Sequence, residues 1–268
     1  MIDIGANLSN EQFRNDMENI ISNAKKSGLT DIILTSTDLK SFYKNADIIN
    51  KYQHIISLYS TIGLHPHYAN SHKDFFAKFE SLMNNKIISI GEFGLDYFRM
   101  LSSKENQIEC MNLFLEKEKI YNLPLFMHER NAQDDFISLL KNQPVKNKKV
   151  VHCFTGNTQS LKKYLELDCF IGITGWFTDT KRGIDLKEAI NYIPLDKLMI
   201  ETDCPYLSPK NKNPYVHRNE PSFLIDIARG ISDIKKIPLE QILEFTKNNS
   251  IDFFSLTPYN EINKKKKI

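Results

Sequence analysis

The sequence lacks the features that mark secreted, disulfide-bonded or membrane-spanning proteins. Its four cysteines are scattered singly, with no Cys-x-x-Cys pair, which argues against a disulfide framework and a thiolate zinc site. No apolar run approaches the roughly 20 residues that a membrane-spanning helix needs. The N-terminal residues 1–4 carry neither a basic region nor a small-residue cleavage site. We therefore expect a soluble, cytoplasmic protein, with the nucleus as the alternative location and no membrane partner.

Strong charge of one sign is also absent. The 35 Lys and Arg residues nearly balance the 33 Asp and Glu residues, for a net charge of +2, so any affinity for nucleic acid must be local. No helix-turn-helix, finger or Gly-rich phosphate loop is visible, and nothing indicates an obligate protein partner, so we expect a monomer. The basic run at residues 264–267 belongs to a segment, 259–268, that we predict to be a short disordered tail.

Eight apolar runs recur along the chain and indicate strands. They begin near Ile2, Asp31, Ile56, Ile87, Pro124, Lys149, Cys169 and Lys197. Their spacing is close to the roughly 30 residues of one strand–helix–strand unit. Because no linker or low-complexity tract interrupts the pattern, we predict one α/β domain over residues 1–258. Its expected fold is a single (β/α)8 TIM-type barrel, favoured over a doubly wound sheet with a second domain.

Helical periodicity is clearest in two of the intervening segments. The first is predicted over Ser9–Ala24, where Ser9 and Gln12 form a candidate capping box at its start. The second is predicted from about Ser103 to Tyr121.

Acids and histidines end several of the strand-like runs, where a barrel carries its functional groups. The run from Ile87 ends in Glu92, His128 and His152 end the fifth and sixth runs, and Asp203 follows the eighth. A lone histidine at such a place is more often structural, but four coincidences on separate strands predict a divalent-cation site. Glu92 can bridge two ions, and Asp203 is the expected base for a metal-activated water. The alternative for Asp203 is a loop cap before Pro205.

Other polar residues fall at the same strand ends or in the loops around them. The first strand and its end supply Asp3 and Asn7, which are candidates for supporting the site. The candidates for binding substrate are His65, His67, Arg130, Arg182 and Arg218. Arg130 can meet a phosphate or pair with Asp134, and His67 can equally be a loop residue of no special role. Aromatic residues in these loops can stack unpaired bases.

Eight sequence motifs, in order along nearly the whole chain, resemble those of the TatD-type metal-dependent deoxyribonucleases, a family of (β/α)8 hydrolases within the amidohydrolase group. They include Gly63-Leu-His-Pro-His67, Ile90-Gly-Glu-Phe-Gly-Leu-Asp-Tyr97, Val151-His-Cys-Phe-Thr-Gly156 and Ile200-Glu-Thr-Asp203. The resemblance implies metal ligation by Glu92, His128 and His152, with Asp203 as a further ligand or base. It also implies magnesium-dependent cleavage of DNA, chiefly from the 3′ end.

The opening motif departs from the pattern of the wider amidohydrolase group. Many relatives have Asp-x-His-x-His-Leu there, whereas this chain has Gly5 and Asn7 at the two histidine positions. A second ion would therefore be weak or oxygen-bound, which favours Mg²⁺, with Mn²⁺ or Zn²⁺ as alternatives, and one or two ions in all. The same departure leaves Asp3 as either a ligand or a buried hydrogen-bond acceptor.

The sequence thus predicts a metal-dependent deoxyribonuclease that hydrolyses phosphodiester bonds, acting as a 3′–5′ exonuclease on single-stranded or frayed DNA. Two alternatives remain at this point. One is an amidohydrolase-type enzyme that cleaves a small cyclic amide or ester, for which an apolar lid over the site is expected. The other is a non-catalytic nucleic-acid-binding scaffold, against which the joint presence of Glu92, His128, His152 and Asp203 counts.

Overall fold

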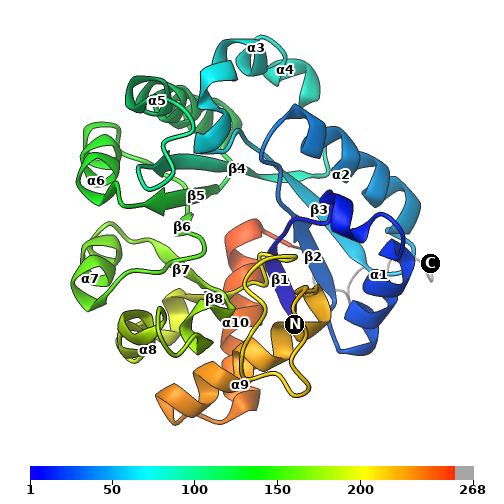
Figure 1. Ribbon diagram of the computed structural model, residues 1–268. Helices are drawn as coiled ribbons and strands as arrows, with labels where there is room; N and C mark the ends of the chain where they lie inside the picture. Colours follow the sequence, from blue (N-terminus) through cyan, green and yellow to red (C-terminus); the bar gives the residue numbers. More distant parts are fainter. Residues whose placement is uncertain (257–268) are drawn as a thin grey trace.

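The eight apolar runs are parallel strands of one sheet, arranged in sequence order, in the computed structural model, which describes residues 1–256 (Figure 1). The strands are β1 (Ile2–Ala6), β2 (Asp31–Leu34), β3 (Ser57–Ile62), β4 (Ile87–Asp96), β5 (Leu125–Arg130), β6 (Lys149–Val151), β7 (Phe170–Ile173) and β8 (Leu198–Ile200). Each begins within one residue of its predicted start. The structure confirms the (β/α)8 barrel.

Backbone hydrogen bonds close the seam between the first and last strands. The N–H of Asp203 donates to the carbonyl of Gly5 at 2.8 Å, and the N–H of Asn7 donates to the carbonyl of Cys204 at 3.0 Å. These contacts lie just beyond β8, so the barrel is nearly closed at the end where the site residues gather. They also fix Asp203 beside the first strand.

Helices surround the sheet (Figure 1). The α-helices are α1 (Met17–Lys26), α2 (Leu39–Tyr52), α3 (His72–Phe76), α4 (Phe79–Leu82), α5 (Lys104–Tyr121), α6 (Gln133–Asn142), α7 (Thr158–Glu166), α8 (Ile184–Ile190), α9 (Leu224–Lys235) and α10 (Leu239–Phe254). Short 3₁₀ helices are η1 (Glu11–Phe13), η2 (Pro66–Ser71), η3 (Gly175–Thr178), η4 (Leu195–Lys197) and η5 (Pro221–Phe223).

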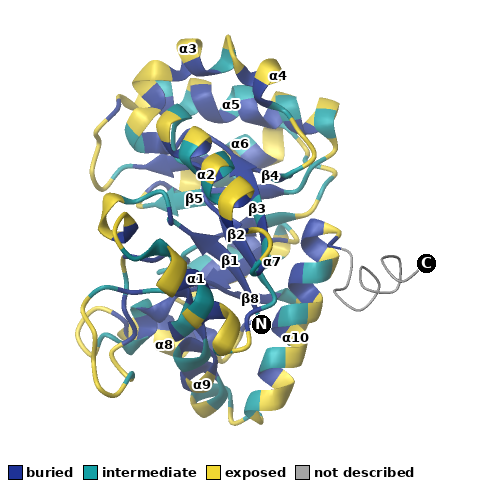
Figure 2. Ribbon diagram, turned by 90° about the vertical axis from the view of Figure 1, so that its right-hand side faces the viewer, coloured by how far each residue is buried: buried dark blue, intermediate teal, exposed yellow. Residues whose placement is uncertain are grey.

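The strands bury both faces, as expected for a parallel sheet. Alternate residues point to opposite faces, and on β5 Leu125 and Met127 join the core beneath the helices while Phe126 joins a second cluster. That second cluster includes Phe253 and Phe254 at the end of α10. In Figure 2, α10 lies on the opposite side of the sheet from the loops that follow the strands. The barrel is therefore packed at that end and open only at the other.

Two helix predictions had different outcomes. Ser103 caps α5 by accepting a hydrogen bond from the N–H of Asn106 at 3.2 Å, so the predicted start is confirmed. The continuous helix from Ser9 is wrong, because the chain there first forms η1 and α1 starts only at Met17. Asn10 is the residue that caps η1. A side-chain cap one residue later competes with the predicted capping box and shortens the helix.

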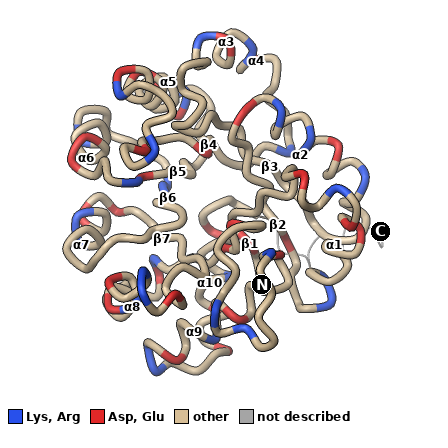
Figure 3. The backbone as a smooth tube through the Cα atoms, in the orientation of Figure 1, with Lys and Arg blue, Asp and Glu red and all other residues tan. Residues whose placement is uncertain are grey.

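Charged residues of both signs are interspersed over the outer helices, and neither sign gathers on one side (Figure 3). Within residues 1–256, no helix combines the length and the apolar character needed to cross a bilayer. The predicted tail, 259–268, and the end of the predicted domain at 258 lie outside the described residues.

Candidate active site

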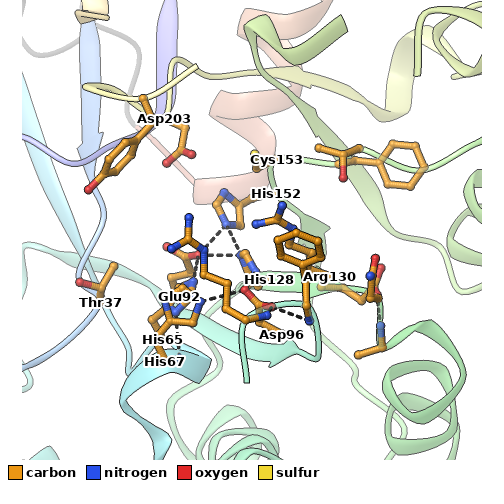
Figure 4. Close-up of a pocket in the computed structure, with 18 of the residues that line it drawn as sticks. Thr37, His65, His67, Glu92, Asp96, His128, Arg130, His152, Cys153 and Asp203 are labelled. Atoms are coloured by element: carbon orange, nitrogen blue, oxygen red, sulfur yellow. Dashed lines mark hydrogen bonds and ion pairs between the residues drawn. The ribbon is translucent and has the colours of Figure 1, made fainter. Parts of the chain in front are cut away.

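Glu92 is the centre of a cluster at the carboxyl ends of the strands. It lies in β4 and is only 4% exposed. Its Oε1 atom meets three imidazole nitrogens: His65 Nε2 at 3.3 Å, His128 Nδ1 at 3.0 Å and His152 Nε2 at 2.8 Å. Figure 4 shows the three rings converging on this carboxylate. The structure thus brings Glu92, His128 and His152 together as predicted and adds His65, which the sequence placed among the substrate-binding residues.

The strand order explains why these side chains meet. His65 follows β3, His128 lies in β5, and His152 directly follows β6, so consecutive strands deliver them to one end of the barrel. Gly94 of β4 pairs with His128 of β5 and has φ +147°, a conformation that side chains rarely adopt. A Cβ atom at Gly94 would collide with the carbonyl oxygen of His128. Glycine therefore permits the close approach of the two strands beside the cluster.

The cluster is electrostatically self-consistent. Burial raises the pKa of Glu92, but the nearby imidazoles of His152, His65 and His128 together hold it well below its usual value. Burial lowers the pKa of His152, yet Glu92 and Glu201 raise it well above normal. Burial dominates at His65 and lowers its pKa to about 4. An ionised Glu92 is therefore the stable state, and His65 is neutral and able to offer a lone pair.

The donor set fits a divalent ion. One ligand atom from each of His65, Glu92 and His128 lies within 4.8 Å of the others. Within residues 1–256, the buried Nε2 of His128 has no hydrogen-bond partner, and its nearest carboxylate oxygen, from Asp96, is 3.7 Å away. Imidazole nitrogens around one carboxylate form a site for Mn²⁺ or Zn²⁺, which would displace the protons that His128 and His152 hold in the absence of an ion. The carboxylate also suits Mg²⁺. The cluster can therefore hold a metal ion.

Asp96, at the end of β4, contacts the cluster from a second side. Its Oδ2 is 2.8 Å from His67 Nε2, and its Oδ1 accepts the N–H groups of Phe98 and Arg99, each at 2.9 Å. Burial raises the pKa of Asp96, but the nearby His128 and the hydrogen bond with His67 together hold it well below its usual value. The sequence alone assigned Asp96 no role. Its position four residues after Glu92 on one strand is the signal that places both on one face.

Asp203 lies across the cleft from the cluster. Figure 4 shows its carboxylate directed toward His152 and Glu92. Its Oδ1 accepts a 2.7 Å hydrogen bond from Asn7 Nδ2, so Asn7 contacts this acid directly. Burial raises the pKa of Asp203 to about 7, and the nearby Glu92 adds to the rise while His152 opposes it. The group can therefore gain or lose a proton near neutral pH.

Asp3 is a buried hydrogen-bond acceptor beneath the site. Its carboxylate accepts the N–H of Thr202 at 2.9 Å, the hydroxyl of Thr202 at 2.5 Å and the N–H of Gly5 at 3.3 Å. Burial raises the pKa of Asp3 to about 7. The sequence left Asp3 as either a metal ligand or a buried hydrogen-bond acceptor. Both of its oxygens accept hydrogen bonds, which matches the acceptor role. The contacts with Thr202 tie β1 to the segment that carries Asp203.

Glu201 is a site residue that sequence reasoning did not select. It is fully buried, accepts the N–H of Cys153 at 2.5 Å and lies 3.3 Å from His152 Nδ1, the ring atom that faces away from Glu92. A Cβ atom added to Gly5 would overlap the Oε2 atom of Glu201. The glycine that stands where the wider group has a histidine thus makes room for the carboxylate of Glu201, which directly follows β8. That carboxylate orients the His152 ring.

The cluster lies in a cleft of about 1480 Å³. Arg130 and Arg182 line this cleft, as do His65 and His67, so four of the five predicted substrate-binding residues face one space. Arg182 stacks on Trp176 at 4.5 Å and is paired with Asp179 at 2.9 Å.

Arg218 does not reach the cleft lining. Its guanidinium makes two hydrogen bonds to Asp16, at 3.1 and 2.5 Å, and one to the carbonyl of Gln12 at 2.7 Å. These contacts fasten the loop after β8 to the segment before α1. A local sequence window cannot reveal such a pairing, because the partners lie about 200 positions apart.

Comparisons with known proteins point to one family. The model of a family described as "TatD related DNase" matches residues 2–255. A protein of Pectobacterium atrosepticum named "3'-5' ssDNA/RNA exonuclease TatD" is 38% identical over 241 residues, which cover 87% of this chain and 91% of the relative. A Pectobacterium parmentieri protein of the same name is 36% identical over 264 residues, covering 96% of this chain and 100% of the relative. The crystal structure of a TatD-family hydrolase from Entamoeba histolytica is 34% identical with a TM-score of 0.87, covering 94% of this chain and 97% of that one.

Proposed function

The chain belongs to the TatD-related DNase family, whose members are hydrolases of nucleic-acid phosphodiester bonds, and from that premise we propose that it is a divalent-metal-dependent 3′–5′ exonuclease acting on single-stranded or frayed DNA. The observation that carries the proposal is the convergence of three imidazole nitrogens on one buried oxygen of Glu92. The curated relatives include RNA in their names, so single-stranded RNA is a second substrate to test.

The proposed ligands are Glu92, His128 and His152, with His65 as a fourth candidate from the structure and Asp203 as a further ligand or base. A divalent ion held there would lower the pKa of a water molecule and draw charge from a phosphoryl oxygen. The resemblance favours Mg²⁺, while the three imidazoles suit Mn²⁺ or Zn²⁺ as well. We propose that the site binds one or two ions. The experiment below compares Mg²⁺, Mn²⁺ and Zn²⁺.

Asp203 is the proposed base. Because its pKa is raised to about 7, it can take the proton of the attacking water at neutral pH without a large energetic penalty. Asn7 donates to one carboxylate oxygen, which holds the side chain in place and leaves the other oxygen free to accept the proton. Glu201 contacts the Nδ1 atom of His152 from behind, which would hold this ring in place as a metal ligand.

The shape of the cleft supports a polymeric substrate. Its volume of about 1480 Å³ exceeds the roughly 300–1,000 Å³ of pockets that enclose small ligands, and basic and aromatic side chains line it instead of an apolar lid. Arg130 is the proposed phosphate contact, together with His67 and the exposed Arg99 that lines the same cleft. The small-amide alternative and the non-catalytic scaffold have no comparable support.

The test is cleavage of a 5′-labelled single-stranded oligonucleotide by the full chain, with Mg²⁺, Mn²⁺ or Zn²⁺ added after chelator treatment. We expect a ladder of products shortened from the 3′ end, no cleavage in chelator, and a block by phosphorothioate linkages at the 3′ terminus. Asp203→Asn should lower the rate by a factor of about 10² or more. Asn tolerates the positive φ of 51° at this position, so the fold should be kept.

Asp179→Asn is the matched control, since among residues 1–256 the carboxylate of Asp179 contacts only Arg182 and the backbone N–H of Lys181. Its rate should stay near that of the parent chain. Full activity of a variant that carries both Glu92→Gln and Asp203→Asn would refute the proposed mechanism. Products cut internally from the outset, without 3′ shortening, would overturn the exonuclease assignment.

A further inference from the structure

The ring of Phe98 stands at the rim of the cleft, beside the cluster. It belongs to the loop between β4 and α5 and lines the cleft. The residue is 58% exposed, although a phenylalanine ring usually avoids water. The guanidinium carbon of Arg130 lies 3.9 Å from the ring centroid. An aromatic ring backed by a cation and open to the cleft is an arrangement that needs an explanation.

We propose that Phe98, backed by Arg130, is a stacking platform for an unpaired nucleobase next to the cleaved bond, an inference that rests on the proposed function. A nucleobase is flat and weakly polar on its faces, so it can cover the exposed ring without meeting an unpaired polar group. Stacking on aromatic side chains is the general means by which single strands are held without reading their sequence. The guanidinium, which is charged at every accessible pH, is positioned to meet the phosphate of the same nucleotide.

The strand geometry places the platform close to the proposed reaction centre. Arg130 follows His128 by two residues on β5, so both side chains lie on one face, and Arg130 is about 6–7 Å nearer the mouth. Asp96 pairs with Arg130 in the strand register. The same Asp96 accepts the N–H of Phe98 and contacts His67 of the cluster. The backbone of Phe98 is thus tied through one carboxylate to His67, beside the cluster.

Arg130 is available for a ligand. Within the described chain, no carboxylate lies at ion-pair distance from its guanidinium, whereas Lys104 pairs with Asp135, Lys163 with Asp134 and Arg182 with Asp179 in the same cleft. The sequence left open whether Arg130 meets a phosphate or Asp134, and Asp134 is instead the partner of Lys163. The stack on Phe98 orients Arg130 without neutralising its charge.

The test combines a change in the protein with a change in the substrate. Two single-stranded DNA oligonucleotides are compared, identical except that one carries abasic residues at its two 3′-terminal positions. We expect the parent chain to bind and cleave the normal strand with a KM about 5- to 100-fold lower than that of the abasic strand. In Phe98→Ala this preference should fall to about 1, because KM rises for the normal strand and changes little for the abasic one.

Two variants separate the ring from other causes. Phe98→Trp should restore the preference, since it supplies another aromatic face, whereas Phe98→Leu keeps the apolar volume and should not. Leu101→Ala is the matched control, because Leu101 is 59% exposed on the same loop but does not line the cleft. It should leave both KM values unchanged. The turnover rate on the abasic strand should be the same in all four variants.

The outcomes also distinguish this inference from the proposed function. If the parent chain cleaves neither strand with any metal, the proposed function fails, and the platform is then tested by fluorescence anisotropy of the two labelled strands in chelator. A preference for bases that Phe98→Ala leaves intact, in cleavage or in binding, overturns the platform even when the exonuclease is confirmed. A preference that disappears in Phe98→Ala and returns in Phe98→Trp supports it.

Discussion

Replacing Gly5 by alanine tests whether the buried Glu201 carboxylate is held in one position. The added Cβ would overlap the Oε2 atom of Glu201 and stand 3.0 Å from Cζ of Phe126. On its other side the carboxylate packs closely against Gly172, where an added Cβ would be only 2.5 Å from its Oε1 atom, and the N–H of Cys153 holds that same Oε1 atom at 2.5 Å. No positive φ is involved at Gly5, so the effect is one of space and not of backbone conformation.

The expected cost follows from this confinement. Overpacking of a tight interior destabilises a protein by about 1–3 kcal/mol. We expect a loss near the upper end of this range, because the Glu201 carboxylate packs closely against both Gly5 and Gly172. About 3 kcal/mol corresponds to a fall in Tm of about 6–12 °C for a chain of this size. Because Glu201 orients His152, we also expect Mn²⁺ affinity to fall about 10- to 100-fold.

Stability is measured by urea and thermal unfolding of the chelated protein, and metal affinity by calorimetric titration. Glu201→Asp in the Gly5→Ala background shortens the side chain by one methylene and should recover part of the stability while metal affinity stays low. A double-mutant cycle then gives the coupling between the two positions. An unfolding free energy of Gly5→Ala within about 0.5 kcal/mol of the parent, together with unchanged Mn²⁺ affinity, would refute the steric account.

Three further changes have outcomes fixed by the contacts described above. Asp3→Asn should flatten the pH dependence of the unfolding free energy. Burial raises the pKa of Asp3 from 3.8 to about 7 in the folded protein. The stability that the protonated carboxyl supplies is therefore complete below about pH 4 and is lost as pH rises through 7. Urea unfolding of the chelated variant should show a slope smaller by up to about 1.4 kcal/mol per pH unit over that window, and an unchanged slope would contradict the shift. Arg218→Ala should lower stability by about 1 kcal/mol through loss of the Asp16 pair and leave the KM for single-stranded DNA unchanged, so a large rise in KM would return Arg218 to the substrate site. Glu92→Gln keeps the shape of the side chain but removes the charge that the imidazoles meet, so calorimetry should detect no Mn²⁺ binding, and retained affinity would place the ion elsewhere.

The fold and the centre of the site were within reach of the sequence for a specific reason. Strands buried on both faces read as continuous apolar runs, and parallel strands in sequence order bring their carboxyl ends together. Glu92, His128 and His152 each end such a run, so their convergence follows from the topology alone. The helix expected from Ser9 failed because Asn10, one position later, caps a 3₁₀ turn instead, a local competition that periodicity does not register.

The contacts that the sequence did not reveal depend on tertiary structure. The link between Glu201 and His152 joins β8 to β6, and the space for it exists only because Gly5 faces the same point from β1. The engagement of Arg218 by Asp16 likewise decides its orientation from a distant segment. In both cases the residue type is compatible with several roles, and its neighbours select one.

Asp96 joins two parts of the cleft that a substrate would use at the same time. One of its oxygens meets His67 and the other holds the backbone N–H groups of Phe98 and Arg99. A substitution at this position would therefore disturb the imidazole cluster and the loop together. A mutation that alters the proposed metal-binding residues through Asp96 therefore also alters the loop that carries Phe98 and Arg99, so these two parts of the cleft cannot be changed independently at this position.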